Sequence, residues 1–197
     1  MPEPASGENT PITMVLPQFR AVALPEPFFP EGMTVRSLRW ADASAWLALV
    51  RAAETLAKIP DDQFERAYGD DAIIIADRVF FALDDEGNPV GTVAAWYGTE
   101  DWEGWGRIHW LYVLPEWQNR KLGRALLSFA LHRLAALGHE KVYLKTSTGR
   151  PKAIKLYERF GFDSETPDAY PCDTVSQNSI CRCGILSVNG RNNEMRQ

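Results

Sequence analysis

The chain has 197 residues, of which 45% are hydrophobic and 24% are charged, as is ordinary for a soluble globular protein with one core. No apolar run approaches the roughly 20 residues needed to cross a bilayer, so we expect no membrane-spanning segment and no membrane partner. No lysine-led apolar stretch typical of a secretion signal opens the chain, and the odd cysteine count argues against a disulfide scaffold. Together these features favour the cytoplasm.

Charge is distributed unevenly along the chain. The net charge is −5, yet residues 118–160 contain ten Lys or Arg against two Glu. A basic segment of this size within an acidic chain indicates a local anionic ligand rather than nucleic acid, which would need a wider basic face. A solvated basic helix surface is the alternative explanation of the same charges.

Hydrophobic periodicity predicts a mixed α/β (α+β) domain over residues 32–188, with an N-terminal extension at 1–31 and a polar tail at 189–197. The extension shows no clear period, and we expect it to be partly disordered or laid over the surface. The predicted strands are 33–39, 78–83, 89–97, 107–114, 141–146, one that begins at Phe162, and 180–188. The predicted helices are 42–53, 60–68, 118–137 and 151–160. The sequence contains neither a G-x-G-x-x-G motif nor a Walker phosphate loop.

The stretch from Arg107 to Ala125 combines a strand, a turn and the start of a helix. Pro115 ends the strand because proline cannot donate a hydrogen bond to a β-ladder. The polar turn that follows offers free backbone N–H groups beside several cations. A helix that begins in this way is a suitable site for an anion.

Three segments resemble the GNAT N-acetyltransferases, and the matched order of elements spans about residues 33–163. They read Leu-Tyr-Val-Leu-Pro-Glu-Trp-Gln at 111–118, Gln118-x-x-Lys121-x-Gly123, and Ala-Ile-x-Leu-Tyr-Glu-Arg-Phe-Gly-Phe at 153–162. The resemblance implies a mostly antiparallel mixed sheet flanked by helices. It also implies transfer of an acetyl group from acetyl-CoA, as co-substrate and without a metal, to an amine.

The chain departs from the family pattern at two positions. Lys121 stands where the family's first glycine usually lies, and Arg150 stands where the family often has Asn. If the motif is shifted by two residues, to Arg120-x-x-Gly123-x-Ala125, the residue types match the family pattern, but the spacing from Pro115 at the end of the strand does not.

The resemblance assigns the contacts with CoA to three places. The backbone of Leu111 and Val113 would bond the pantetheine arm, and Arg150 and Lys152 either reach the phosphates or are solvated. The turn and first helical residues would bind the pyrophosphate; they are Gln118, Asn119, Arg120, Lys121, Leu122, Gly123, Arg124 and Ala125.

Acyl transfer to an amine needs a base for the ammonium proton and an acid for the departing thiolate. The resemblance assigns the acid to Tyr157, whose phenol has an ordinary pKa of about 10. His109 stands where relatives often have a glutamate, and it is either the base or a packed strand histidine. Glu100 and Glu103 are the alternative bases, or part of a solvated acidic loop.

The sequence therefore predicts an N-acetyltransferase acting on a small-molecule or peptide amine. The acidic surface outside residues 118–160 favours a cationic acceptor, and a homodimer is compatible with the resemblance. The alternative is a non-catalytic, regulatory acyl-CoA-binding module on the same fold. The cysteines Cys172, Cys181 and Cys183 have no neighbouring histidines, so no metal site is predicted.

Overall fold

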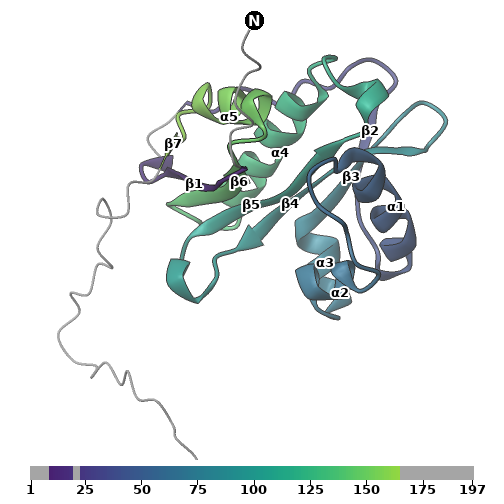
Figure 1. The fold of residues 1–197 in the computed structure, drawn as a ribbon, viewed down its shortest axis with the longest axis horizontal. Coiled ribbons are helices and arrows are strands. Elements are labelled where there is room, and N and C mark those ends of the chain that lie inside the picture. Colours follow the sequence, from purple (N-terminus) through teal and green to yellow (C-terminus); the bar gives the residue numbers. More distant parts are fainter. Residues whose placement is uncertain (1–8, 20–22, 165–197) are drawn as a thin grey trace, which may run out of the picture. The chain divides into compact units, whose positions relative to one another are not determined.

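The computed structural model describes residues 9–19 and 23–164, which form a seven-stranded sheet with helices on both faces (Figure 1). The strands are β1 (Pro11–Leu16), β2 (Thr34–Ser37), β3 (Val79–Leu83), β4 (Pro89–Tyr97), β5 (Gly106–Val113), β6 (Val142–Ser147) and β7 (Asp163–Ser164). The helices are α1 (Ala43–Ala53), α2 (Gln63–Tyr68), α3 (Ala72–Arg78), α4 (Leu122–Ala136) and α5 (Pro151–Glu158). The predicted fold class is confirmed.

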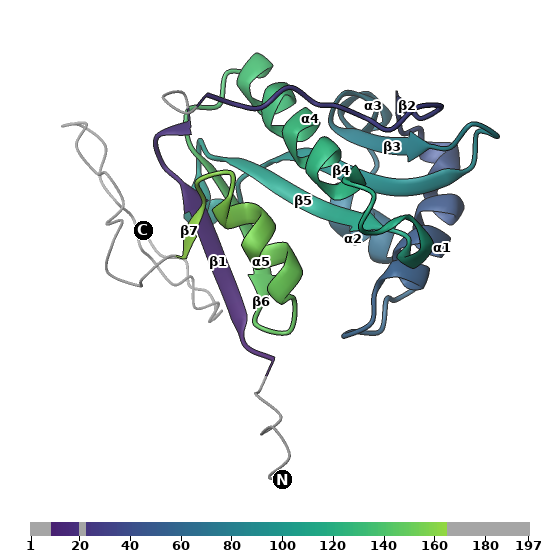
Figure 2. The same ribbon diagram turned by 90° about the horizontal axis from the view of Figure 1, so that it is seen from above.

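The order of strands in the sheet is β2-β3-β4-β5-β6-β1-β7, and every neighbouring pair is antiparallel except β5 and β6. That parallel pair is short: Gly106–Ile108 of β5 lie opposite Val142–Leu144 of β6, and no further residues of the two strands are in register. Beyond Ile108 the two strands diverge, as Figure 2 shows. The sheet therefore has an opening between its two halves.

Two apolar clusters hold the helices onto opposite faces of the sheet. Because successive strand side chains point to opposite faces, Phe80 joins the cluster under α4 and α5, and Phe81 joins the cluster under α1, α2 and α3. In the second cluster the fully buried Trp46 ring makes edge contacts with Phe64 and Tyr68 at centroid distances of 5.4 Å. This aromatic packing fixes α1 and α2 beside β5.

Residues 11–16 correct the interpretation of 1–31 as an extension, because they form β1 inside the sheet. Met14, Val15 and Leu16 are all buried, with at most 3% of each exposed. A strand covered on both faces has no polar–apolar alternation, which explains why no period was visible in the sequence. Residues 23–31 continue over α4, where the Ser128 hydroxyl donates to the Pro25 carbonyl.

Helix α3 was not predicted, because its Ile73-Ile74-Ile75 run is typical of a strand. The Asp71 carboxylate starts the helix by accepting from the backbone N–H groups of Ile73 and Ile74 at 2.9 and 3.0 Å. Helix α4 begins at Leu122, four residues after its predicted start. Among the described helices, none is both long enough and apolar enough to cross a membrane.

Several sequence predictions lie outside the described residues. They are the strand at 180–188, the domain end at 188, the tail at 189–197, and the metal-free state of Cys172, Cys181 and Cys183.

We predict that Met14→Ala destabilises the protein by about 2–4 kcal/mol, because it removes a fully buried side chain from the sheet core. Thr13→Ala, at the half-buried neighbour on the same strand, should cost less than about 1 kcal/mol. Urea unfolding of both variants measures the difference. If neither variant changed the free energy of unfolding appreciably, the position of β1 in the core would be contradicted.

Candidate active site

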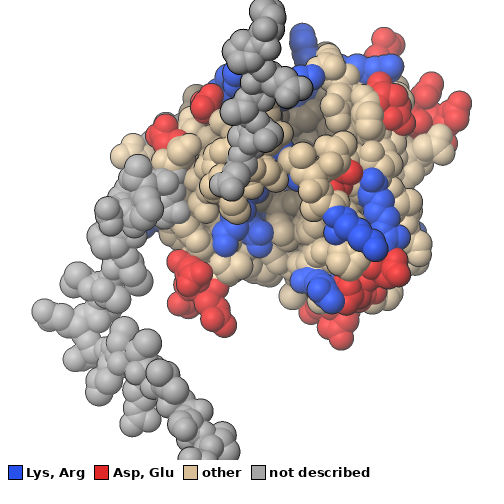
Figure 3. Space-filling model, in the orientation of Figure 1, with Lys and Arg blue, Asp and Glu red and all other residues tan. Residues whose placement is uncertain are grey.

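Where β5 is no longer paired with β6, a cleft of about 760 Å³ lies between β5, the start of α4 and one side of α5. The space-filling view shows this face hollowed between the parts that carry α5 and α1, with Lys and Arg atoms beside the hollow (Figure 3). Most of the predicted site residues line this cleft: Leu111, Val113, Gln118, Asn119, Lys121, Leu122, Gly123, Arg124, Arg150, Lys152 and Tyr157. The structure thus brings together segments that are far apart in the sequence.

Arg120 and Ala125 are the two predicted cofactor-binding residues that do not line the cleft. The Arg120 guanidinium lies over the Trp117 ring at 4.7 Å. Ala125 lies in the first turn of α4 and is buried, with 2% exposed.

A bulge in β5 sets which side chains face the two sides of the opening. His109 pairs with Ala94 and Tyr112 pairs with Thr92, so two β5 residues lie opposite a single β4 residue. Trp110, at the bulge, has a φ of 48°. As a result Trp110 and Tyr112 both pack against the α1 side of the sheet, and Leu111 packs against the α4 side.

The backbone of the turn before α4 explains why the family usually has glycine where this chain has Lys121. Lys121 has a φ of 65° and a ψ of 4°, in the left-handed region that favours glycine. Asn119 also has a positive φ, 61°. The Gln118 side-chain amide donates to the Val113 carbonyl at 3.2 Å and ties the turn to the end of β5.

A partly buried polar cluster joins Glu54, Tyr112 and Arg150 beside the cleft. Glu54, at the end of α1, accepts from the Arg150 guanidinium at 2.6 Å and from the Tyr112 hydroxyl. The Glu54 side chain is 3% exposed. Burial raises the pKa of Glu54, but the hydrogen bonds from Arg150 and Tyr112 outweigh burial and hold it below its ordinary value. The cluster therefore joins α1, β5 and the start of α5 through an ion pair.

A smaller hollow of about 340 Å³ lies on the α1 side of the same opening, and His109 lines it. It shares four lining residues with the cleft: Leu111, Tyr112, Arg150 and Tyr157. Tyr157 therefore lies where the two spaces meet. Burial raises the pKa of Tyr157 to about 12, so its phenol keeps its proton at neutral pH.

His109 lies in the smaller hollow among aromatic side chains, with its ring 6.0 Å from the Tyr68 ring and 5.5 Å from the Trp110 ring. Burial and, secondarily, the charge of Arg107 hold the pKa of His109 well below its usual value. The imidazole is therefore neutral at pH 7 and has a nitrogen able to accept a proton. Glu100 and Glu103, the alternative bases, line a different hollow beside Tyr97.

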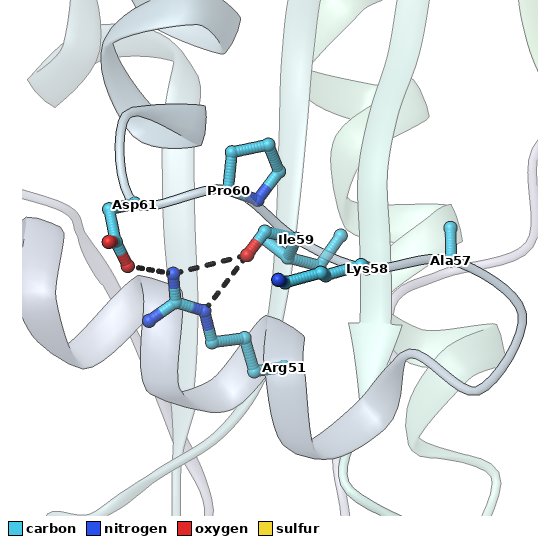
Figure 4. Close-up of a pocket in the computed structure, with 6 residues that line it drawn as sticks. All are labelled: Arg51, Ala57, Lys58, Ile59, Pro60 and Asp61. Atoms are coloured by element: carbon cyan, nitrogen blue, oxygen red, sulfur yellow. Dashed lines mark hydrogen bonds and ion pairs between the residues drawn. The ribbon is translucent and has the colours of Figure 1, made fainter.

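Another hollow lies at the connection between α1 and α2 (Figure 4). There the Arg51 guanidinium donates to the Ile59 carbonyl at 3.1–3.2 Å and to the Asp61 carboxylate at 2.5 Å. These bonds hold the connection whose residues Leu56 and Ala57 form a wall of the smaller hollow.

Sequence reasoning missed Glu54, Tyr112 and Arg107. Glu54 follows a helix with no motif around it, so the sequence offered no signal for it. Arg107 did leave a signal, because it alternates with His109 as a polar residue on a largely apolar strand.

The chain matches the model of the Acetyltransferase (GNAT) family over residues 36–162. It is 33% identical over 155 residues to a mycothiol acetyltransferase of Streptomyces griseus subsp. griseus, a match that covers 74% of this chain and 48% of that protein. It is 34% identical over 149 residues to a mycothiol acetyltransferase of Salinispora tropica, covering 71% of this chain and 47% of that protein. The chain thus spans about half the length of these curated relatives.

Solved structures share the fold. A GCN5-related N-acetyltransferase from Sphaerobacter thermophilus superposes with a TM-score of 0.64 at 23% identity, over 80% of this chain and 49% of that chain. The ribosomal-protein-S18-alanine N-acetyltransferase from Escherichia coli gives a TM-score of 0.57 at 22% identity, over 68% of this chain and 79% of that one.

We predict that Lys121→Gly is more stable than Lys121→Ala by about 0.5–1.5 kcal/mol, because only glycine is unstrained at this positive φ. Both variants lose the same charge, so their difference isolates the backbone contribution. Chemical denaturation measures it. A Lys121→Ala variant at least as stable as Lys121→Gly would contradict the left-handed turn.

We predict that Glu54→Gln lowers stability by about 1–3 kcal/mol at pH 7, because it weakens a buried charged hydrogen-bond pair. The folded pKa of Glu54 lies below its ordinary value of 4.5, so the ionised carboxylate stabilises the fold above pH 4.5. This contribution is lost as the pH falls, and the gap in Tm between wild type and variant should shrink below pH 4.5. Glu65→Gln, an exposed carboxylate on α2, is the control. A gap that is the same at pH 3 and pH 7 would refute the role of the charge.

Proposed function

Because the chain belongs to the GNAT acetyltransferase family, we propose that it transfers an acetyl group from acetyl-CoA to a primary amine of a small molecule or peptide. One observation carries this proposal: Tyr157 lines both the large cleft and the smaller hollow that contains His109. Acetyl transfer requires the thioester of acetyl-CoA and the acceptor amine to come into contact. The two spaces that could hold these substrates are both lined by Tyr157.

The large cleft suits the co-substrate that the family uses. Lys121, Arg124 and Lys152 line it with positive charge, and the first N–H groups of α4 are free of helical partners. A Cβ on Gly123 would meet only Leu156 and Val113, at 3.8 and 3.9 Å, so the fold itself does not require glycine there. The missing side chain leaves the cleft floor open for close approach of a ligand, which supports pyrophosphate binding at this turn.

The β5 backbone supports binding of the pantetheine arm. Within the described residues, β5 beyond Ile108 has no strand partner on its β6 side. Backbone groups at an interrupted ladder need other partners, and an extended amide-containing arm supplies them.

The side chains at the meeting point support direct transfer. Acetyl-CoA supplies an acyl group activated as a thioester. Neutral His109 accepts the proton that the attacking amine loses, directly or through a water molecule. Tyr157 donates its phenolic proton to the departing sulfur, and Arg150, whose charge lowers the Tyr157 pKa, stabilises the phenolate that remains.

The alternative is an acyl-CoA-binding module without turnover, suggested by Lys121 and Arg150 in place of the family's usual residues. Lys121 adopts the left-handed conformation and Arg150 pairs with Glu54, so neither replacement disrupts the cleft, and only turnover distinguishes the two functions. Incubation with acetyl-CoA and a panel of amines separates the two. A rise in Tm with CoA but no thiol release with any amine would favour the module.

We predict that Tyr157→Phe lowers kcat about 100-fold or more, because the thiolate then leaves without a proton donor. The KM for acetyl-CoA should change little, since the ring and its packing remain. In the wild type a Tyr157 pKa of about 12 keeps the phenol protonated, so Tyr157 should cause no loss of kcat up to pH 10. Tyr97→Phe, the same change at an exposed position outside both spaces, is the control. Undiminished thiol release by Tyr157→Phe would remove Tyr157 from the mechanism.

A further inference from the structure

Within the described part of the chain, Arg107 is a partly buried cation without a carboxylate partner. It lies on β5, lines the smaller hollow, and its guanidinium lies over the Tyr143 ring at 5.8 Å. Its Nε is enclosed and makes no hydrogen bond with any residue that the structure describes. No ion pair joins Arg107 to an acid within residues 9–19 and 23–164, although buried charges in proteins are ordinarily paired.

The rest of the lining of the smaller hollow adds positive charge. Lys145 and Arg150 are its other cations, and among the residues that the structure describes no Asp or Glu lines it. Arg150 is committed to Glu54, and His109 is neutral. The described side chains therefore give this hollow unpaired positive charge. The sequence predicts a cationic acceptor from the acidic residues outside 118–160, and the charge of the hollow favours the opposite.

We propose that the smaller hollow binds an amine that also carries an anionic group, a carboxylate or a phosphate, and that Arg107 selects the acceptor by pairing with that group. The proposal rests on the acetyl transfer proposed above and names the class of acceptor. The guanidinium supplies up to five donors in a fixed fork, which suits the planar carboxylate and the phosphate alike.

The register of β5 limits the size of this acceptor. Arg107 and His109 are two residues apart before the bulge, so their side chains leave the same face of the strand about 7 Å apart. An acceptor that reaches both has its anionic group a few bonds from its amine. This describes an amino acid or a small amino phosphate better than a long polyamine.

The test compares pairs of amines that differ only in the anionic group, with the full chain and acetyl-CoA. One pair is an α-amino acid and its amide, and the other is an amino sugar and its phosphate ester; spermidine represents the cationic class. We expect kcat/KM to be at least about tenfold higher for the anionic member of one pair, and which pair responds distinguishes carboxylate from phosphate.

Arg107→Gln should raise the KM for the preferred anionic amine about 10- to 100-fold and leave the KM of its neutral partner nearly unchanged. Arg107→Lys should keep part of the preference, because it keeps the charge without the fork. Since Arg107 has no described acidic partner, neither change should lower the Tm appreciably, which separates recognition from a structural role. Arg66→Gln, on the exposed face of α2, is the matched control.

The outcomes distinguish this inference from the proposed function. Thiol release that is equal for both members of each pair, or fastest with spermidine, would overturn the anionic-acceptor proposal and leave acetyl transfer intact. An unchanged preference in Arg107→Gln would also overturn it. Absence of thiol release with every amine, while CoA still raises the Tm, would refute the proposed function itself.

Discussion

The structure depends on the early end of the parallel pairing between β5 and β6. Three residues of each strand are in register, and then the strands separate. A continuous ladder would have occupied the N–H and C=O groups of β5 in hydrogen bonds to β6 and left no opening between the two strands. Because the ladder stops at Ile108, the β5 backbone is left open to the cleft on the α4 side and to the smaller hollow on the α1 side, and Tyr157 lines both spaces.

An opening in a sheet leaves polar backbone without ladder partners, so other contacts must hold its edges apart. Here the edges are joined by side chains. Glu54 from α1, Tyr112 from β5 and Arg150 before α5 form one hydrogen-bonded group that spans the gap. Charged hydrogen bonds are directional, so this group fixes the distance between the halves better than apolar packing would. The ion pair thus acts on the geometry of the site and not only on its charge.

The sequence predicted the parts of the molecule that local patterns encode. The hairpin of β3 and β4 follows from two apolar, β-favouring runs on either side of the polar turn at 84–88, and α4 and α5 follow from helical spacing. The residues that meet in the cleft could be proposed because two motifs, at 111–118 and 153–162, resemble one family.

Features that depend on distant partners could not be predicted. Residues 14–16 show no period because both faces of the strand are buried there, and burial is a property of the finished sheet. The role of Glu54 as a hydrogen-bond acceptor depends on Arg150 and Tyr112, which are 96 and 58 residues away in the sequence. Arg107 has no acidic partner among the described residues, and this too depends on which residues the finished fold brings near it, so the sequence pattern alone could not predict it.

The place of β1 has a consequence for how the protein folds. This strand is among the first parts of the described chain, yet its neighbours in the sheet are β6 and β7, and the backbone N–H of Thr10 bonds Thr148 at a separation of 138 positions. Contacts of such long range carry a large loop-closure cost and form slowly. During synthesis the half of the sheet with β2 to β5 has all its strands long before β6 emerges from the ribosome. We therefore expect β1, β6 and β7 to assemble last, onto the part of the sheet that contains β2 to β5. Until β6 is available, β1 has no strand to pair with.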